Sequence, residues 1–366
     1  MANLRPILLM GLLALSYVMW VEWQKDYGAQ PQPATQVANT AYDTPPIPSV
    51  QNTAATARDL PAAIPGVPSA GQIGESQAVM TGASELLIIR TDVLELGIDL
   101  TGGTVVTAKL LNYPVELEVS EIKVDLLSRE GPEMFIAQSG LLSSAPAPNH
   151  TAVYQSSTMN YTLGQNAEEI RVPLTWDDAS GVHVTKTFIL KRGKYDLTVR
   201  HTLSNQSGQS WSGSRYSQLQ RSILADKDDG GFTNPGRYSF FGIGFYSPAE
   251  KFEKVNFDDV ASEPFQGSFS DGWVSMVQHY FFTAWIPPQG EVNAYSTKVI
   301  SPGGFPRYIA SAVSPPVAVA AGTTHQFESR LYVGPKLQDE IEEVAPGLDH
   351  TVNYGIFTVF SKPLFW

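Results

Sequence analysis

The sequence predicts a mainly β protein, built as an extended antiparallel β-sandwich. Leu94, Leu96, Ile98 and Leu100 alternate with polar or small residues, which is the period of a half-buried strand. Residues 182–190 and 195–203 show a similar pattern on either side of a Lys-Arg-Gly-Lys turn, as in a hairpin. Helical periods are nearly absent from 85 to 333, while Gly, Pro, Asn and Ser recur at short intervals. Many short strands with frequent turns favour sheets that pack face to face.

The N-terminal segment predicts a membrane anchor. Residues 6–21 contain no charge and are rich in Leu, Ile, Met and Ala. The segment reaches a bilayer-spanning length if the charged side chains at its two ends snorkel. Tryptophans near its C-terminal end match an interfacial aromatic belt. We expect residues 1–27 to form a transmembrane helix that includes Pro6, Leu12 and Trp20.

The charges around this segment predict its orientation. Arg5 precedes it, and Glu22 and Asp26 follow it together with Lys25. The positive-inside rule then places the N-terminus in the cytoplasm and the later residues outside. A cleaved signal peptide is the alternative, but the residues after the apolar stretch are too bulky for a cleavage site.

Residues 28–83 change abruptly in composition. Pro, Ala, Gln, Thr and Gly dominate, charges are few, and no apolar period persists. Such a segment cannot bury enough surface to offset its chain entropy, so we expect a disordered tether. A flexible chain of about 50 residues has a root-mean-square reach of roughly 40 Å.

The remaining elements are expected between residues 84 and 366. Short apolar segments bounded by turn residues predict further strands, and we assign the sandwich to 84–335; these segments are 105–111, 217–223, 273–286, 294–300, 308–313 and 326–333. Leu337, Ile341 and Val344 form the apolar stripe of a short helix, which Ala345-Pro346-Gly347 stops. We therefore assign residues 336–366 to a helical linker.

Composition excludes several classes of function. The chain has 24 Lys+Arg and 36 Asp+Glu in 366 residues, a net charge of −12, and no basic run, so nucleic acid is not an expected partner. It has no Cys, which removes disulfides, thiolate metal sites and Cys nucleophiles.

Motifs for catalysis, metals and cofactors are also missing from the sequence. The six His form no H-x-x-x-H or H-E-x-x-H pattern, and no Ser lies in a G-x-S-x-G motif. Residues 226–231 resemble half of a calcium loop but lack its later ligands. His183 and His201 lie on predicted strands and are interpreted as surface or core-edge residues. We expect no cofactor, no metal site and no enzyme activity.

The aromatic run from Trp273 to Pro287 is the most distinctive local feature. It predicts a central core strand, and a platform that stacks on a ligand is the alternative. This run resembles the corresponding strand of YidC-type membrane protein insertases of Gram-negative bacteria. Other segments resemble the same family in chain order: Arg90–Leu96, Gln138–Leu141, Thr185–Gly193, Tyr246–Pro248, Glu250–Lys254, Leu331–Asp339, Val344–Gly355 and Ser361–Trp366.

The resemblance implies a fold and a role. It implies one transmembrane helix in the bacterial inner membrane and a large periplasmic domain shaped as a β-supersandwich, like that of galactose mutarotases. In the family five more transmembrane helices follow, and a hydrophilic groove among them inserts membrane proteins without catalysing a reaction. The implied partners are the lipid bilayer, nascent inner-membrane proteins, and the Sec translocon with its auxiliary subunits.

The resemblance also implies two sites. A Sec contact is expected roughly in 222–259, for which we choose Tyr246, Lys251, Phe252 and Lys254. An interfacial helix is expected to begin near the last residues, Pro363, Leu364, Phe365 and Trp366, after the N-cap Ser361. A native terminus seldom ends on exposed Leu-Phe-Trp, so we expect a truncated chain.

Two alternatives belong to other functional classes. A membrane-anchored enzyme of the mutarotase type would need a His and a carboxylate that converge in a cleft. A carbohydrate-binding module would use Trp273 or Trp285 to stack on a sugar ring, and burial of both indoles would exclude it.

Overall fold

The computed structural model describes Tyr17, residues 59–61 and residues 85–352, apart from 117–118, 130, 132, 224–239 and 303–304. Two compact units are distinguished, 1–53 and 54–366. Tyr17, in the first unit, is helical and exposed. The predicted anchor residues Pro6, Leu12 and Trp20 and the predicted interfacial helix lie outside the described residues. No helix among the residues described is long and apolar enough to cross a membrane.

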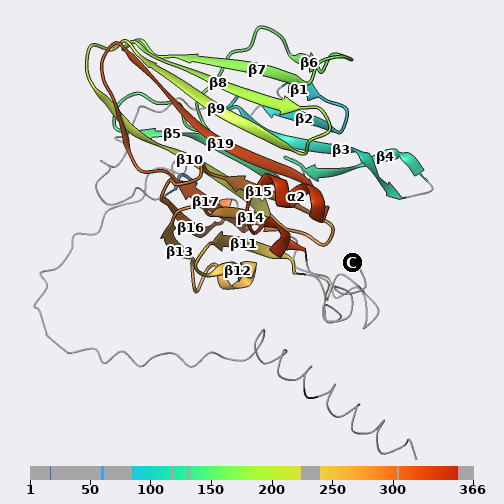
Figure 1. Cartoon of the computed structure of the whole chain (residues 1–366). Helices are drawn as coiled ribbons and strands as arrows, with labels where there is room; N and C mark the ends of the chain where they lie inside the picture. Colours follow the sequence, from blue (N-terminus) through green and yellow to red (C-terminus); the bar gives the residue numbers. More distant parts are fainter. Residues whose placement is uncertain are drawn as a thin grey trace, which may run out of the picture. The chain divides into compact units, whose positions relative to one another are not determined.

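Two large sheets make up the described part of the second unit (Figure 1). The eleven-stranded sheet, here called the large sheet, runs in the order β13 (Gln266–Phe269), β16 (Asn293–Ile300), β17 (Arg307–Val313), β10 (Trp211–Ser222), β5 (Phe135–Ser143), β3 (Thr104–Glu116), β2 (Leu94–Asp99), β1 (Leu87–Arg90) and β6 (Asn160–Thr162), with β4 (Val119–Leu127) beside β3 and β18 (Val317–Val319) beside β10. Its strands are antiparallel except for the pair β1–β6.

The eight-stranded sheet, here called the small sheet, runs in the order β12 (Lys251–Val255), β11 (Gly242–Ser247), β14 (Trp273–Val277), β15 (Phe281–Ile286), β19 (Thr323–Pro335), β9 (Asp196–Asn205), β8 (Val182–Lys191) and β7 (Glu169–Asp177). Short helices complete the described elements: η2 (Phe257–Asp259), α2 (Gln338–Val344) and η4 (Leu348–Thr351). The strands and these short helices confirm the predicted mainly β class.

The core lies between the two sheets, and strand alternation explains which residues enter it. On β9, Leu197, Val199, His201 and Leu203 are buried while the residues that alternate with them are half-buried. Residues of both sheets join in one apolar cluster, for example Phe245 of the small sheet and Tyr295 of the large sheet, whose rings lie 6.3 Å apart. The period of two that predicted the strands is therefore the period that fills the core.

The aromatic run is a correction to the expected strand pattern. We expected one strand over 273–286, but the structure forms a hairpin of β14 and β15. The turn is Gln278-His279-Tyr280, and the backbone N–H of Gln278 donates to the carbonyl of Phe281 at 2.9 Å. Both strands are almost entirely buried, so their apolar residues leave no alternation to mark the turn.

The predicted short helix is confirmed as α2, with one difference. Ile341 and Val344 are buried as expected, but Leu337 is exposed and occupies the N-cap position. The third residue of the predicted stripe therefore lies before the helix.

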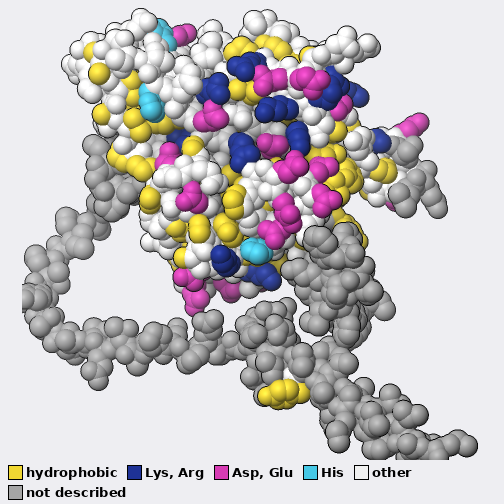
Figure 2. All heavy atoms as spheres, viewed as in Figure 1, with side chains coloured by type: hydrophobic (Ala, Val, Ile, Leu, Met, Phe, Trp, Pro, Cys, Tyr) yellow, Lys and Arg dark blue, Asp and Glu magenta, His cyan; other side chains and the backbone are white. Residues whose placement is uncertain are grey.

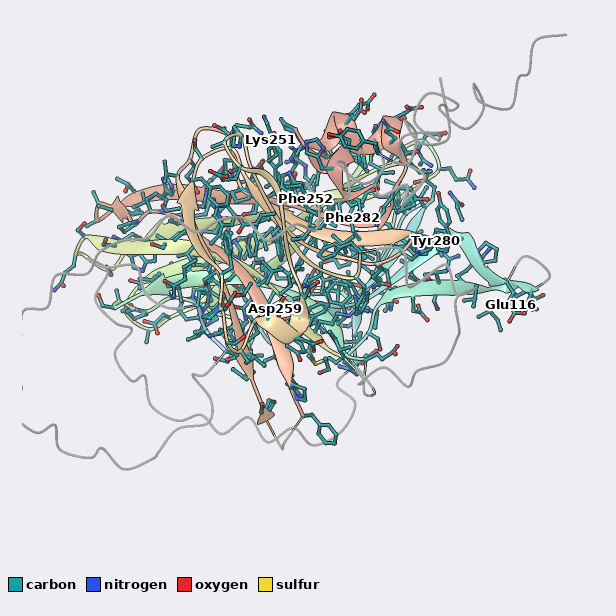
Figure 3. The ribbon with its side chains drawn as sticks, turned by 90° about the horizontal axis from the view of Figure 1, so that it is seen from below. Glu116, Lys251, Phe252, Asp259, Tyr280 and Phe282 are labelled. Atoms are coloured by element: carbon teal, nitrogen blue, oxygen red, sulfur yellow. The ribbon has the colours of Figure 1, made fainter. Side chains whose placement is uncertain are left out.

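The hairpin of β3 and β4 extends beyond the other strands (Figure 1). Val115, Val119 and Ile122 on it are exposed. Glu116 lies at its far end, well apart from Lys251, Phe252 and Asp259 (Figure 3). This separation makes the hairpin a suitable place for control substitutions.

Candidate partner-binding site

The predicted contact residues lie on two adjacent strands at one edge of the small sheet. Tyr246 is on β11, and Lys251, Phe252 and Lys254 are on the edge strand β12. The antiparallel register places Phe252 opposite Tyr246 and Lys254 opposite Gly244, so these side chains share the outer face. Lys251 pairs with Ser247 and points to the other face. The predicted set is therefore divided between two faces of the sheet.

On the outer face, an aromatic row crosses three strands. The ring of Tyr246 stacks on Trp273 with a centroid distance of 5.5 Å and an angle of 9°, and Phe252 lies 5.7 Å from Trp273. Tyr246 is buried, Phe252 is half-buried, and Lys251 and Lys254 are exposed. Tyr246 therefore packs beneath the surface. Phe252 is partly accessible to a partner, and Lys251 and Lys254 are more accessible.

The chain after β19 covers this aromatic row. The indole N–H of Trp273 donates to the carbonyl of Pro346 at 3.0 Å. Gly347, between α2 and η4, has a φ of 77°, and a Cβ there would lie 2.1 Å from a ring carbon of Tyr246. Only glycine fits both the left-handed backbone and this close approach. The C-terminal short helices are thereby held against β11 and β14.

On the inner side of β12, a pocket of about 550 Å³ lies between the edges of the two sheets. Phe245, Phe265 and Phe269 supply apolar lining, and the first two rings stack at 4.0 Å. Charged residues from β12 and from the segment before β13 also line it: Glu250, Lys251, Glu253, Lys254, Asp259 and Glu263. Burial, followed by repulsion from Glu250, raises the pKa of the Glu253 carboxyl. The pocket therefore combines an apolar interior with four carboxylates and two ammonium groups.

Both strands beside this pocket are edge strands. Among the described strands, β12 pairs with β11 alone and β13 pairs with β16 alone. No described strand pairs with the outer side of either one, and adding a strand at such an edge is a common way in which sheets bind extended segments. The family resemblance selected Lys251 and Lys254 but not Asp259 and Glu263, which line the pocket from the segment between β12 and β13.

The buried indoles exclude sugar stacking in this structure. Trp273 and Trp285 are each 1% exposed. The indole N–H of Trp285 donates to the carbonyl of Gln218 at 3.1 Å, inside the sandwich. Neither ring has a free face for a sugar, so the stacking hypothesis is wrong and the core interpretation of the aromatic run is confirmed.

The described histidines do not form the cleft that a mutarotase would need. His201 is fully buried in the core rather than at its edge, and both of its ring nitrogens lack a partner. His183 contacts Asp177 at 2.5 Å on the exposed hairpin of β7 and β8. His150 contacts Asp59 at 2.9 Å but is buried. None of these lines the pocket, and the described residues hold no cluster of three or more metal-ligating side chains.

A buried basic pair occupies the centre of the sandwich. Lys186 of β8 lies opposite His201 of β9, in rows that are otherwise apolar. The Lys186 ammonium crosses to the large sheet and donates to the carbonyls of Gly102, at 2.8 Å, and Ser139, at 3.0 Å. Burial lowers the pKa of Lys186 to about 7, and burial followed by Lys186 and Arg215 holds the pKa of His201 well below its ordinary value. Lys186 thus joins the two sheets, and both Lys186 and His201 are closed to solvent.

Comparison with known proteins assigns the family. The family model described as the YidC periplasmic domain matches residues 87–366, which include both sheets and the pocket. The chain belongs to the YidC periplasmic domain family. The membrane protein insertase YidC of Methylococcus capsulatus is 36% identical over 371 residues, covering 100% of this chain and 64% of that protein. The YidC of Thioalkalivibrio sulfidiphilus is 33% identical over 376 residues, with the same coverage. The chain therefore spans 64% of the length of these curated relatives.

Among solved structures, a galactose mutarotase related enzyme from Lactobacillus acidophilus matches with a TM-score of 0.43 and 8% identity. The match covers 68% of this chain and 96% of that chain. At this TM-score we draw nothing from the likeness about a ligand or an activity of this YidC-family chain.

Proposed function

We propose that this chain is the anchor and accessory periplasmic part of a YidC-type insertase, which assists the insertion and folding of inner-membrane proteins. In this proposal residues 1–27 span the inner membrane, 28–83 form the tether, 84–335 the periplasmic sandwich, and 336–366 the linker toward further transmembrane helices. The family match and the uncharged N-terminal segment support it. The nascent inner-membrane protein and the lipid bilayer are then partners of the whole insertase rather than of the sandwich alone.

Protease treatment of spheroplasts tests this topology. We expect external protease to digest the sandwich in intact spheroplasts and to leave a tag placed before Met1 uncut, because the tag would be cytoplasmic. Lysis should make the tag accessible, which serves as the control. A sandwich that is protected until lysis would contradict the proposed orientation.

We further propose that an auxiliary subunit of the Sec translocon binds at the β11–β12 edge. The observation that supports this most directly is the open pocket between two sheet edges, with Lys251 and Lys254 exposed beside it. An extended segment could pair with β12 and place its side chains in the pocket. The mixed charges of the lining would set the register and the association rate more than the affinity.

Charge reversal on β12 tests this contact. Lys251→Glu with Lys254→Glu should reduce capture of the Sec auxiliary subunits about fivefold, since two exposed charge contacts contribute on the order of 1 kcal/mol together. The control is Lys109→Glu with Lys123→Glu on the β3–β4 hairpin, where both lysines are half-buried and neither lines the pocket. Capture should be measured at low and high salt, because screening should reduce the difference. Equal capture by both double variants would contradict this site.

A further inference from the structure

Three residues of the predicted tether, Asp59, Leu60 and Pro61, lie against the sandwich. The Asp59 carboxylate is 2.9 Å from Nε2 of His150, in the segment between β5 and β6. Nζ of Lys298, on β16, donates to the carbonyl of Leu60. Pro61 is buried. The composition of 28–83 predicted no such contact, because it shows no apolar period.

Tyr216 of the large sheet holds His150 in position for its contact with Asp59. The hydroxyl of Tyr216, on β10, accepts from the backbone N–H of His150 at 2.8 Å and lies 2.7 Å from its Nδ1. Burial raises the pKa of Tyr216 well above its ordinary value, so the hydroxyl keeps its proton and donates it to Nδ1. Nε2 then carries the single N–H proton of the ring and donates it to the Asp59 carboxylate. Each hydrogen-bonding atom in this chain of contacts has a partner.

The contacts also match in charge and position. Lys298 and Tyr216 both lie on the large sheet, on β16 and β10, which are separated by β17. Burial would raise the pKa of Asp59, but the hydrogen bond from His150, with the charge of Lys298, holds it below its ordinary value. A carboxylate between a histidine N–H and an ammonium is a strong charge-assisted contact.

We propose that residues 59–61 form a clip, which fastens the tether to the outer face of the large sheet through His150 and Lys298. The tether between the anchor and the sandwich is then residues 28–58 rather than 28–83. A flexible chain of about 31 residues reaches roughly 30 Å, against roughly 40 Å for the whole tether. Docking of the clip is independent of the proposed function, while its effect on reach depends on the proposed anchor.

The sequence supplies a direct assay of the clip. Arg58 is the single Lys or Arg between Lys25 and Arg90, and it immediately precedes the clip. Limited trypsin digestion of the full chain in detergent should therefore cut slowly after Arg58 when the clip is docked. Lys298→Met and His150→Gln should each raise the rate of this cut, and the double variant should raise it at least tenfold. These variants leave the cleaved sequence unchanged.

Matched controls separate release of the clip from unfolding. Lys191→Met, at an exposed position, and His183→Gln, at a half-buried one, make the same substitutions away from the clip and should leave the rate unchanged. Because His150 is buried, Lys298→Met alone must show the increase with an unaltered unfolding midpoint. A cut in the unsubstituted chain that is as fast as in an unfolded peptide would overturn the proposal, and so would equal protection in all variants.

A distance measurement gives a second test that does not depend on a protease. The chain has no Cys, so Leu60→Cys in the clip with Thr151→Cys beside His150 allows spin labels at two positions only. We expect one short, narrow distance distribution, and a broad, longer one when Lys298→Met and His150→Gln are added. A broad distribution before these substitutions would overturn the proposal.

Discussion

Replacing Lys186 with Met should remove a pH dependence of stability that the unsubstituted chain shows between about pH 7 and pH 9. The pKa of Lys186 is lowered from 10.5 to about 7 by burial. Between these values the unfolded chain binds a proton that the folded chain does not, so raising the pH favours the folded state. The stability difference between the unsubstituted chain and Lys186→Met should grow by about 1.4 kcal/mol per pH unit in this window. Below about pH 7 the difference should level off, because both states then hold the proton.

Urea unfolding in detergent, followed by tryptophan fluorescence at pH 6, 7, 8 and 9, measures this difference. At pH 9 the neutral amine still donates to Gly102 and Ser139, so the unsubstituted chain should be the more stable of the two. Lys191→Met, an exposed position on the same strand, is the matched control and should give a parallel profile. If the unfolding free energy of Lys186→Met also changes with pH in parallel with that of the unsubstituted chain, then Lys186 is not a buried lysine without a counter-charge.

The second large effect is expected for Gly347→Ala. Alanine at a φ of 77° costs about 1 kcal/mol, and its Cβ would meet the Tyr246 ring at 2.1 Å. The ring cannot move aside easily, because it is stacked on Trp273. Overpacking of this kind costs about 1–3 kcal/mol more, so we expect a total loss of roughly 3 kcal/mol or detachment of the C-terminal short helices. Denaturant unfolding reports the first outcome, and hydrogen exchange of residues 338–351 reports the second.

Gly322→Ala and Gly290→Ala separate the strain of the backbone from the clash. Both glycines have nearly the same positive φ as Gly347, but a Cβ at either would meet nothing within 4 Å. Each should lose only the backbone contribution of about 1 kcal/mol. If Gly347→Ala loses no more than these controls, then the contact with Tyr246 does not hold the C-terminal segment in place.

Much of the fold could be predicted from local patterns. Alternation identified β2, β8 and β9, but His201 was interpreted as a surface or core-edge residue, and the structure buries it fully on the same face as Leu197 and Val199. The same reasoning failed over 273–286, where both faces are buried and alternation disappears. It also could not identify Lys186 as a core residue, because a lysine in an apolar row is ordinarily read as an edge or a surface residue.

The candidate site was predicted less completely. Sequence resemblance selected the β11–β12 segment, but the register of the sheet buries Tyr246 and turns Lys251 away from Phe252. The second wall of the pocket comes from Asp259, Glu263 and β13, in the segment that leads from β12 of the small sheet to the large sheet. Positive and negative side chains are interspersed on the face seen in Figure 2, so net charge alone did not point to this edge.

The sequence by itself determined the β class, the family and the periodicity of the core, because these follow from neighbouring residues and from shared motifs. The tertiary structure decided which side chains meet across distances of many residues. It placed Lys186 against Gly102 and Ser139, Gly347 under Tyr246, and Asp59 beside His150. Each of these contacts joins segments that only sheet pairing and sheet packing bring together, and such long-range closures leave no local pattern in the chain.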